Sequence, residues 1–383
     1  MIDLAAARET FDASTDFTVG IEEEFSLNDP ATLELTGAYE SLSSAALADP
    51  VLRDAVAGEL IASEIEIRSG AGRDLSDAID RQRDARRRLF ALADAHGVRL
   101  GATGTHPLSD YREQRIIDTE HYRRVQDGLR YVAWRNNTFS VHVHVGIKGA
   151  DRAIRVCDRL RPVLPLLLAV SANSPFLDGR DSGLHSARTQ SFTKSFPRCG
   201  VPDSFGSWAA WQEYVELLVR TNSIIEFTQL WWSVRPHAAF GTIEMRICDA
   251  QITQEESEGL TELIVACVKQ AAAEVDAGDV PPDVPARLIE ENMWRATRYG
   301  LDGRLLDLGA PSIDEFPAAE TAERLAAWSG AEVVLPSLNG AQRQRRQIDA
   351  GATPAEVYAA CLSETRQTYG GSAASSRQER VTP

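Results

Sequence analysis

The sequence predicts an α+β fold, in which a sheet is covered by helices on one of its faces. Two observations lead to this prediction. Four short stretches alternate apolar and polar residues with a period of two, which is the pattern of a strand buried on one face. Between and after them, longer stretches repeat apolar residues about every 3.6 positions, as amphipathic helices do.

Each predicted strand places its apolar residues on one face and its polar residues on the other. The strands are expected at residues 17–27, 61–69, 139–147 and 243–249. In the first, Val19, Ile21 and Phe25 alternate with Glu22 and Glu24. If the four strands share a sheet, its apolar face is the one that helices cover. The opposite face then carries Glu22, Glu24, Glu64, Glu66, Arg68, His142, His144, Glu244 and Arg246.

Stretches with helical spacing of apolar residues account for most of the remaining chain. The first of them is closed by Gly97, and the second is expected to bend at Pro162 and Pro165, because proline lacks the N–H that a helix interior needs. Residues 173–205 show little periodicity, and a loop of that length is usually functional or disordered. The helices are expected at 74–95, 151–172, 207–221, 255–277, 285–299, 319–328 and 354–368.

The domain organisation is expected to be simple. We find no internal repeat and no low-complexity linker in the interior of the chain. The sequence therefore predicts a flexible N-terminus at 1–14, a single catalytic domain at 15–369 and a flexible tail at 370–383.

Composition excludes several kinds of partner. The 383 residues include 56 acidic and 40 basic side chains, and a net charge of −16 repels nucleic acid and anionic lipid. The five cysteines are scattered without a CxxC pair, which indicates reduced, buried thiols in a cytoplasmic protein. The longest apolar stretch, 163–170, contains Pro165 and is too short to span a bilayer, so no membrane partner is expected.

The acidic face of the predicted sheet indicates a divalent metal site. A solvated surface is the simpler interpretation of each strand taken alone. However, none of the four strands contains a lysine, and like charges that face each other across strands destabilise a sheet unless a cation joins them. Clustered carboxylates suit Mg²⁺ or Mn²⁺, and Mg²⁺ usually binds together with substrate phosphates. The face therefore favours ATP-dependent phosphoryl transfer.

Three neighbouring features refine this hypothesis. Glu23 falls on the apolar side of its strand and is expected to be structural, whereas Glu59 is a candidate further ligand. The chain has no P-loop motif, so metals and arginines would have to hold the phosphates. Arg246 shares the face of Glu244 and is the candidate to stabilise a transferring phosphoryl group.

A metal-dependent amidohydrolase is the alternative that the histidines raise. His142 and His144 form an H-x-H pair on a strand, as in barrels where zinc activates water. Such a site needs further histidines, and here only His185 and His237 follow. It would also leave the acidic residues of the sheet unexplained. We expect His142 to bind metal and His144 to be structural.

Four motifs resemble the type 2 glutamate–cysteine ligases, a family of carboxylate–amine ligases. They occur in the family's order across about residues 17–370, and together they are much more specific than any one alone. The motifs are GIEEEF at 20–25, VHVHVGI at 141–147, RPHAAFGTIEMR at 235–246 and ENMWRATRYG at 291–300.

The resemblance implies a glutamine-synthetase-like core whose mainly antiparallel sheet forms a cupped active-site floor. It implies that ATP phosphorylates the glutamate side chain to give an acyl phosphate. An amine then attacks the acyl phosphate, and cysteine is the expected amine. By position, it implies metal ligands at Glu22, Glu24, Glu66, His142 and Glu244, with Glu59 as an addition. It also implies catalytic roles for Arg246 and for Arg295 or Arg298, and substrate-binding roles for Arg188, Arg198 and Arg235.

The sequence departs from the family pattern near the predicted substrate loop. Ser140 stands where a glycine is usual, and Cys199 and residues 191–193 are unusual. These departures put the acceptor amine in question rather than the metal site. The leading hypothesis is a Mg²⁺- and ATP-dependent ligase, with a homodimer as a reasonable assembly. The alternatives are the amidohydrolase and a non-catalytic ligand-binding relative.

Overall fold

A single antiparallel sheet forms the centre of the molecule. The computed structural model describes residues 2–279, 283–309, 312, 314–333 and 335–371. Within these residues the sheet has seven strands, in the order β10-β11-β5-β1-β3-β2, with β4 also paired to β1. Its strands are β1 (Val19–Asn28), β2 (Val56–Ala57), β3 (Glu64–Arg68), β4 (Arg99–Gly101), β5 (Val141–Gly146), β10 (Val234–His237) and β11 (Thr242–Met245). The predicted α+β fold with a mainly antiparallel sheet is confirmed.

All four predicted strands are shorter than expected. β3 begins at Glu64 because Ile61 instead forms an isolated bridge with Ile116, outside the sheet. β11 ends at Met245, opposite the first residue of β10, and one further bond follows from the Arg246 N–H to the Ser233 carbonyl at 2.9 Å.

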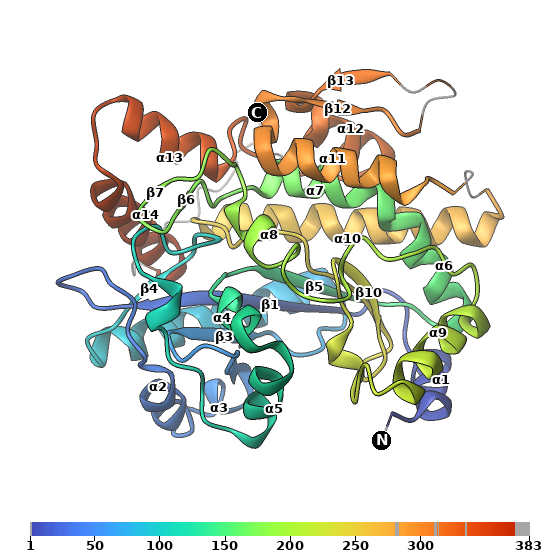
Figure 1. Ribbon diagram of the computed structural model, residues 1–383, viewed down its shortest axis with the longest axis horizontal. Helices are drawn as coiled ribbons and strands as arrows, with labels where there is room; N and C mark the ends of the chain where they lie inside the picture. Colours follow the sequence, from blue (N-terminus) through green and yellow to red (C-terminus); the bar gives the residue numbers. More distant parts are fainter. Residues whose placement is uncertain (1, 280–282, 310–311, 313, 334, 372–383) are drawn as a thin grey trace, which may run out of the picture.

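Helices cover the apolar face of the sheet. α4 (Leu75–Ala95) packs on β1, β3 and β4, while α6 (Ala150–Leu160) and α10 (Gln254–Ala277) pack on the strands from β5 to β10. α7 (Leu164–Ser171) and α11 (Ala286–Tyr299) pack on each other farther from the sheet (Figure 1). The chain bends between α6 and α7 through a 3-10 turn at Arg161–Val163, as the two prolines predict. The other predicted helices are α9 (Trp208–Arg220), α12 (Thr321–Ser329) and α14 (Pro354–Tyr369).

The apolar faces of the strands and helices form two main cores, a larger one under β5, β10 and β11 and a smaller one between β3 and α4. Val19, Ile21, Val143, Ile243 and Met245 are each at most 1% exposed and belong to the larger core. Their alternation partners therefore face the other side of the sheet. None of the helices in the described ranges has the length and apolar character that crossing a membrane requires.

The prediction of a flexible N-terminus is wrong. Residues Leu4–Ala13 form helix α1, whose first turn is capped by the Asp3 side chain. Phe11 is fully buried and packs edge-on against Trp208 of α9, with ring centroids 5.8 Å apart. The burial of a single large aromatic side chain fixes this helix on the core. Most of the predicted flexible tail, at 372–383, lies outside the described residues.

Several short elements were not predicted. Their apolar residues are too few to give a clear period, so packing rather than pattern defines them. They are α2 (Tyr39–Ala46), α3 (Leu52–Ala55), α5 (Glu120–Leu129), α8 (Ala187–Ser191), α13 (Gly340–Asp349), β6 (Phe176–Leu177), β7 (Arg180–Asp181), β8 (Cys199–Gly200), β9 (Trp231–Trp232), β12 (Arg304–Leu306), β13 (Glu315–Pro317) and 3-10 turns at Tyr111–Glu113, Arg130–Asn136, Phe227–Gln229, Gly300–Asp302 and Ala318–Glu320.

The long stretch at 173–205 is held by one buried carboxylate. Asp249, which is fully buried, accepts hydrogen bonds from the Asn173 N–H at 2.8 Å, Ser174 Oγ at 2.6 Å and Ser186 Oγ at 2.9 Å. These bonds join both ends of the segment before α8 to the end of the β11 region. Residues 173–186 are therefore fixed in place ahead of α8.

Candidate active site

The polar face of the sheet forms the floor of a cavity of about 440 Å³. Strands β1, β3, β5, β10 and β11 supply its floor, and α5, α8 and the segments around Glu59, Phe196 and Trp231 supply its walls. Side chains from positions as far apart as Glu22 and Arg246 therefore line one space. The predicted cupped floor is present.

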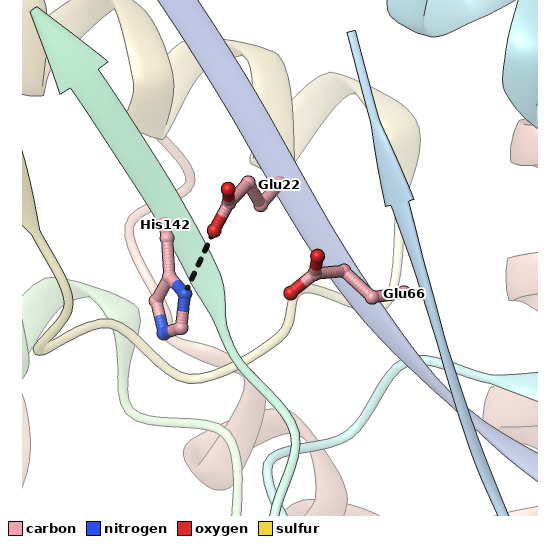
Figure 2. A group of neighbouring side chains, drawn as sticks. All are labelled: Glu22, Glu66 and His142. Carbon is pink, nitrogen blue, oxygen red and sulfur yellow. Dashed lines mark hydrogen bonds and ion pairs between the residues drawn. The ribbon is translucent and has the colours of Figure 1, made fainter. Parts of the chain in front are cut away.

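Acidic and histidine side chains on this floor form three overlapping groups that could each hold a metal ion. In each group, one donor atom per residue lies within 4.8 Å of the others. Glu22 and Glu66 each belong to two groups, so the groups are contiguous. Figure 2 shows Glu22, Glu66 and His142 converging from three adjacent strands. The groups are Glu22–Glu66–His142, Glu22–His144–Glu244 and Glu24–Glu59–Glu66.

Strand register explains why these residues meet. Glu22 lies directly opposite His142, and His144 lies directly opposite Glu244, in neighbouring antiparallel pairs. Glu24 lies opposite Glu66 in the pair formed by β1 and β3. Directly opposite residues of an antiparallel pair project on the same face with their Cβ atoms about 5 Å apart. The period-two pattern and this register together are enough to build the cluster.

Both histidines of the H-x-H pair reach the cluster. His142 Nδ1 lies 3.4 Å from Glu22 Oε2, and His144 Nε2 lies 3.4 Å from Glu22 Oε1. Burial, with the nearby Arg246 guanidinium, lowers the pKa of His142. Burial opposes protonation of His144 as well, but Glu22 and Glu244 outweigh it and raise its pKa. The structure thus gives His144 a place in the cluster that the sequence analysis did not.

The carboxylates of Glu59 and Glu66, in the part of the cluster formed by β1 and β3, lack enough positive charge around them. Burial, reinforced by the Glu24 carboxylate, raises the pKa of Glu59 to about 7. Burial and the neighbouring Glu22 also raise the pKa of Glu66 well above its usual range. Buried carboxylates in such numbers need a counter-charge, and oxygen-rich groups suit hard divalent cations. The residues present therefore fit a divalent metal site.

Arg246 and Arg235 both pair with Glu244. Arg235 Nε donates to Glu244 Oε2 at 2.5 Å, and Arg246 Nη1 donates to Glu244 Oε1. Burial acts against ionisation of Glu244, but the two guanidinium groups outweigh it and hold its pKa well below the usual range. Arg246 lines the cavity and its side chain is 15% exposed, so its guanidinium can contact a ligand there.

Arg188 and Arg235, two of the predicted substrate-binding arginines, line the cavity but are bonded to the protein. Arg188 lines the cavity, but its Nη1 and Nη2 donate to the carbonyls of Ile247 and Arg246 at 3.0 and 3.1 Å. Arg235 also donates to the carbonyl of Leu230 at 2.7 Å, so its guanidinium is occupied by the protein. Both guanidinium groups are therefore held mainly by protein partners and shape the cavity.

Two predicted site residues lie elsewhere. Arg198 is not among the cavity-lining residues of the described chain, and its Nε donates to the Gln229 carbonyl at 3.1 Å. Arg295 also lies outside the cavity lining and donates to Glu291 at 2.8 Å and Glu315 at 2.6 Å. The i,i+4 pair along α11 and the β13 carboxylate attract this guanidinium away from the site. The prediction that Arg295 faces the active site is wrong.

Three further residues from the sequence analysis also differ in whether they reach the cavity: Arg298 and Glu64 do not, and Glu59 does. Arg298 donates to the Gly183 carbonyl at 2.5 Å and is also outside the cavity lining, as far as the described residues show. Glu64 is 1% exposed and likewise outside the lining, and burial beside Glu24 raises its pKa well above the usual range. Glu59, by contrast, joins a ligand group.

Sequence reasoning missed several cavity residues. Arg68 was placed on the polar face by the alternation but given no role, and it lines the cavity and pairs with Glu66. Tyr122 of α5 and Phe240 of the β10–β11 turn also line the cavity. No periodic pattern surrounds these two, so only the fold reveals them.

Glu23 is structural, as its place on the apolar side of β1 predicts. Arg86 of α4, which is fully buried, donates to Glu23 through Nε at 2.5 Å and Nη2 at 2.6 Å. Gln82 donates to the same carboxylate at 2.8 Å. Adjacent glutamates of β1 therefore have opposite surroundings, Glu22 in the cavity and Glu23 in a buried ion pair.

Two solved structures resemble this chain in fold. A bifunctional glutathione synthetase from Pasteurella multocida matches 95% of this chain and 54% of its own, with a TM-score of 0.68 and 12% identity. A glutamate–cysteine ligase from Francisella tularensis in complex with AMP matches 93% of this chain and 89% of its own, with a TM-score of 0.64 and 13% identity. At these identities the likeness concerns the fold.

Sequence relatives carry the identification further. A protein of Rubrobacter xylanophilus that is named for glutamate–cysteine ligase activity is 40% identical over 81% of this chain and 79% of its own. The glutamate–cysteine ligase of Natronomonas pharaonis is 35% identical over 90% of this chain and 94% of its own. These findings define the class of protein, an ATP-dependent ligase. The chain belongs to glutamate–cysteine ligase family 2, whose model matches residues 18–374. The family favours a ligase over the amidohydrolase alternative.

Proposed function

We propose that this ligase uses Mg²⁺ and ATP to convert the side-chain carboxylate of glutamate into an acyl phosphate, which cysteine then attacks through its amine to give an amide. A carboxylate is a poor electrophile at neutral pH, and phosphorylation supplies a leaving group. The observation that carries the proposal is the convergence of three carboxylate-rich ligand groups and Arg246 on the floor of one cavity.

The residues of the cavity floor would have two roles, metal binding and stabilisation of charge on the phosphoryl group. Divalent cations, when bound, would neutralise phosphate charge as the phosphoryl group moves. Glu22, Glu24, Glu59, Glu66, His142, His144 and Glu244 would hold them. Arg246 would stabilise the equatorial charge of the phosphoryl group, since its guanidinium lines the cavity and is fixed by Glu244. Arg235 fixes Glu244 from the other side.

Mg²⁺ is the preferred metal of the proposal because five of the seven candidate ligands are carboxylates. Hard oxygen donors favour Mg²⁺, and the two imidazoles make Mn²⁺ a workable substitute. Cysteine is proposed as acceptor from the names of the relatives. The aromatic side chains Phe192, Phe196 and Trp231 on the cavity wall are compatible with other small amines as well.

The proposal is tested by measuring ADP release with glutamate and Mg²⁺ fixed and the amine varied. Cysteine is expected to give the highest rate in a panel of amino acids and simple amines, with no release after chelation of the metal. ADP release that does not depend on glutamate, or that occurs without an amine, would contradict the ligase reaction. If another amine gave the fastest rate, that amine would be the acceptor in place of cysteine, and the proposed ligase reaction would stand.

A further inference from the structure

An exposed aromatic ring stands at one rim of the active-site cavity. Phe240 lies in the turn between β10 and β11 and lines the cavity, yet it is 57% exposed. The turn is closed by the N–H groups of Phe240 and Gly241, which donate to the His237 carbonyl at 3.1 and 3.0 Å. Gly241 has a φ of +65°, which glycine adopts without strain. The position of the ring is therefore set by a short, tightly hydrogen-bonded turn.

Neighbouring imidazoles fix the orientation of this ring. Phe240 stacks on His237 with centroids 4.3 Å apart and an interplanar angle of 15°. It meets His144 edge-on, with centroids 5.6 Å apart. His144 belongs to the ligand group with Glu22 and Glu244. The exposed ring is thus the immediate neighbour of one predicted metal position.

We propose that Phe240 is the platform on which the adenine ring of ATP stacks. The inference rests on the proposed function, which puts the phosphates over the ligand groups. Of the three proposed substrates, ATP alone carries a planar aromatic group, and that group is joined to the phosphates that the adjacent cluster would hold. Stacking on adenine would cover apolar surface that the free protein leaves in water.

The other aromatic side chains of the cavity are less suited to this role. Phe192 and Phe196 are 7% and 6% exposed and pack on each other, with centroids 4.4 Å apart. Trp231 in turn packs against Phe196. Trp231 and Tyr122 are only partly exposed, and the Tyr122 hydroxyl donates to the Gly58 carbonyl at 2.5 Å. Phe240, by contrast, keeps more than half of its surface free.

The test compares nucleotide binding with binding of the phosphates alone. Calorimetry with ADP and with inorganic tripolyphosphate, each with Mg²⁺, is run on the wild-type protein and on Phe240→Ala and Phe240→Trp. Trp294→Ala is the matched control, because Trp294 is also exposed (47%) but lies on α11 outside the cavity lining of the described chain. Phe240→Ala is expected to weaken ADP about tenfold and to leave tripolyphosphate unchanged. Phe240→Trp and Trp294→Ala are expected to bind ADP like the wild type.

Steady-state kinetics give a second readout. Phe240→Ala is expected to raise the KM for ATP about tenfold, with kcat and the KM for glutamate little changed. Equal ADP affinity in the wild type and Phe240→Ala would overturn the inference, and so would equal weakening of ADP and tripolyphosphate, or a rise in the acceptor KM in place of the ATP KM. A wild-type protein that binds no ADP would instead remove the proposed function itself.

Discussion

Glu22 Oε2 lies 3.4 Å from His142 Nδ1, across the antiparallel pair of β1 and β5. The same carboxylate reaches His144 through its other oxygen, and Glu22 therefore joins two of the three ligand groups. Together with Glu66, which also belongs to two groups, Glu22 is therefore a residue on which the proposed metal cluster depends most. Glu24, two positions along the strand, belongs to one group only.

The two glutamates provide a matched test of the cluster. Glu22→Gln is expected to bind fewer Mn²⁺ ions than Glu24→Gln, because the amide keeps the shape but removes a charge shared by two groups. ADP release by Glu22→Gln should fall at least about 100-fold. Titration of Mn²⁺ by electron paramagnetic resonance counts the ions. Equal ion counts in the two variants would show that Glu22 does not join the groups.

Alanine variants of Arg246 and Arg295 compare an arginine in the cavity with one outside it. Arg246→Ala is expected to lower kcat about 10²–10³-fold, because a fixed donor is lost from the charge that develops on the phosphoryl group. Arg235 still pairs with Glu244 in this variant, so the fold should survive. Arg295→Ala serves as the control and is expected to stay within about twofold of the wild type, since its partners are surface carboxylates.

The comparison of these two arginine variants in the ADP-release assay is decisive in either direction. A large loss of kcat in Arg295→Ala would return that residue to the mechanism. Full activity in Arg246→Ala would remove Arg246 from it.

The buried pair of Glu23 and Arg86 is expected to support the fold rather than the reaction. Glu23→Gln leaves the Arg86 guanidinium, which is fully buried, without its closest counter-charge. We expect a loss of roughly 3–5 kcal/mol in the free energy of unfolding, measured by urea denaturation. Glu291→Gln, which breaks the exposed pair with Arg295, should cost less than about 1 kcal/mol. Similar costs for both variants would contradict this assignment.

His106 is expected to make the protein sensitive to mild acid. Its Nδ1 accepts hydrogen bonds from the N–H groups of Leu108 and Ser109 at 3.2 and 2.9 Å, and its Nε2 lies 2.8 Å from the Leu33 carbonyl. The neutral ring satisfies all three contacts, whereas protonation of Nδ1 would break two of them. Burial lowers the pKa of His106 from 6.5 to about 4.

The sign of the pH effect follows from proton uptake. Between pH 6.5 and 4 the unfolded chain protonates this histidine and the folded chain does not, so stability falls as the pH falls through this window. The loss from His106 between pH 7 and pH 5 should be about 2 kcal/mol. His106→Gln should show a correspondingly smaller loss over the same interval. Identical pH slopes in urea denaturation of the two proteins would contradict the prediction.

The sheet and its polar face could be predicted because strand alternation is a local property. The pattern around Glu22, His142 and Glu244 assigns each side chain to a face, and the observed register then brings them together. The role of Glu23 follows from the same pattern. The sequence also predicts the break between α6 and α7, since the effect of proline on a helix is local.

The errors concern properties that only the assembled structure decides. Helix α1 owes its position to Phe11 packing on Trp208, about 200 residues away in the chain, and no local pattern reports that contact. Arg295 was misplaced because Glu315, on a strand that was not predicted, competes for its guanidinium. Phe240 and Tyr122 reach the cavity from a turn and a short helix whose positions depend on the fold.

Formation of an acyl phosphate is tested by transfer of an oxygen isotope from glutamate to phosphate. Glutamate labelled with ¹⁸O in its side-chain carboxylate is incubated with the enzyme, ATP, Mg²⁺ and cysteine, and the released phosphate is analysed by mass spectrometry. Attack of the amine on an acyl phosphate leaves one carboxylate oxygen on the phosphate, so each phosphate should carry one ¹⁸O. Unlabelled phosphate formed together with the amide would contradict the account.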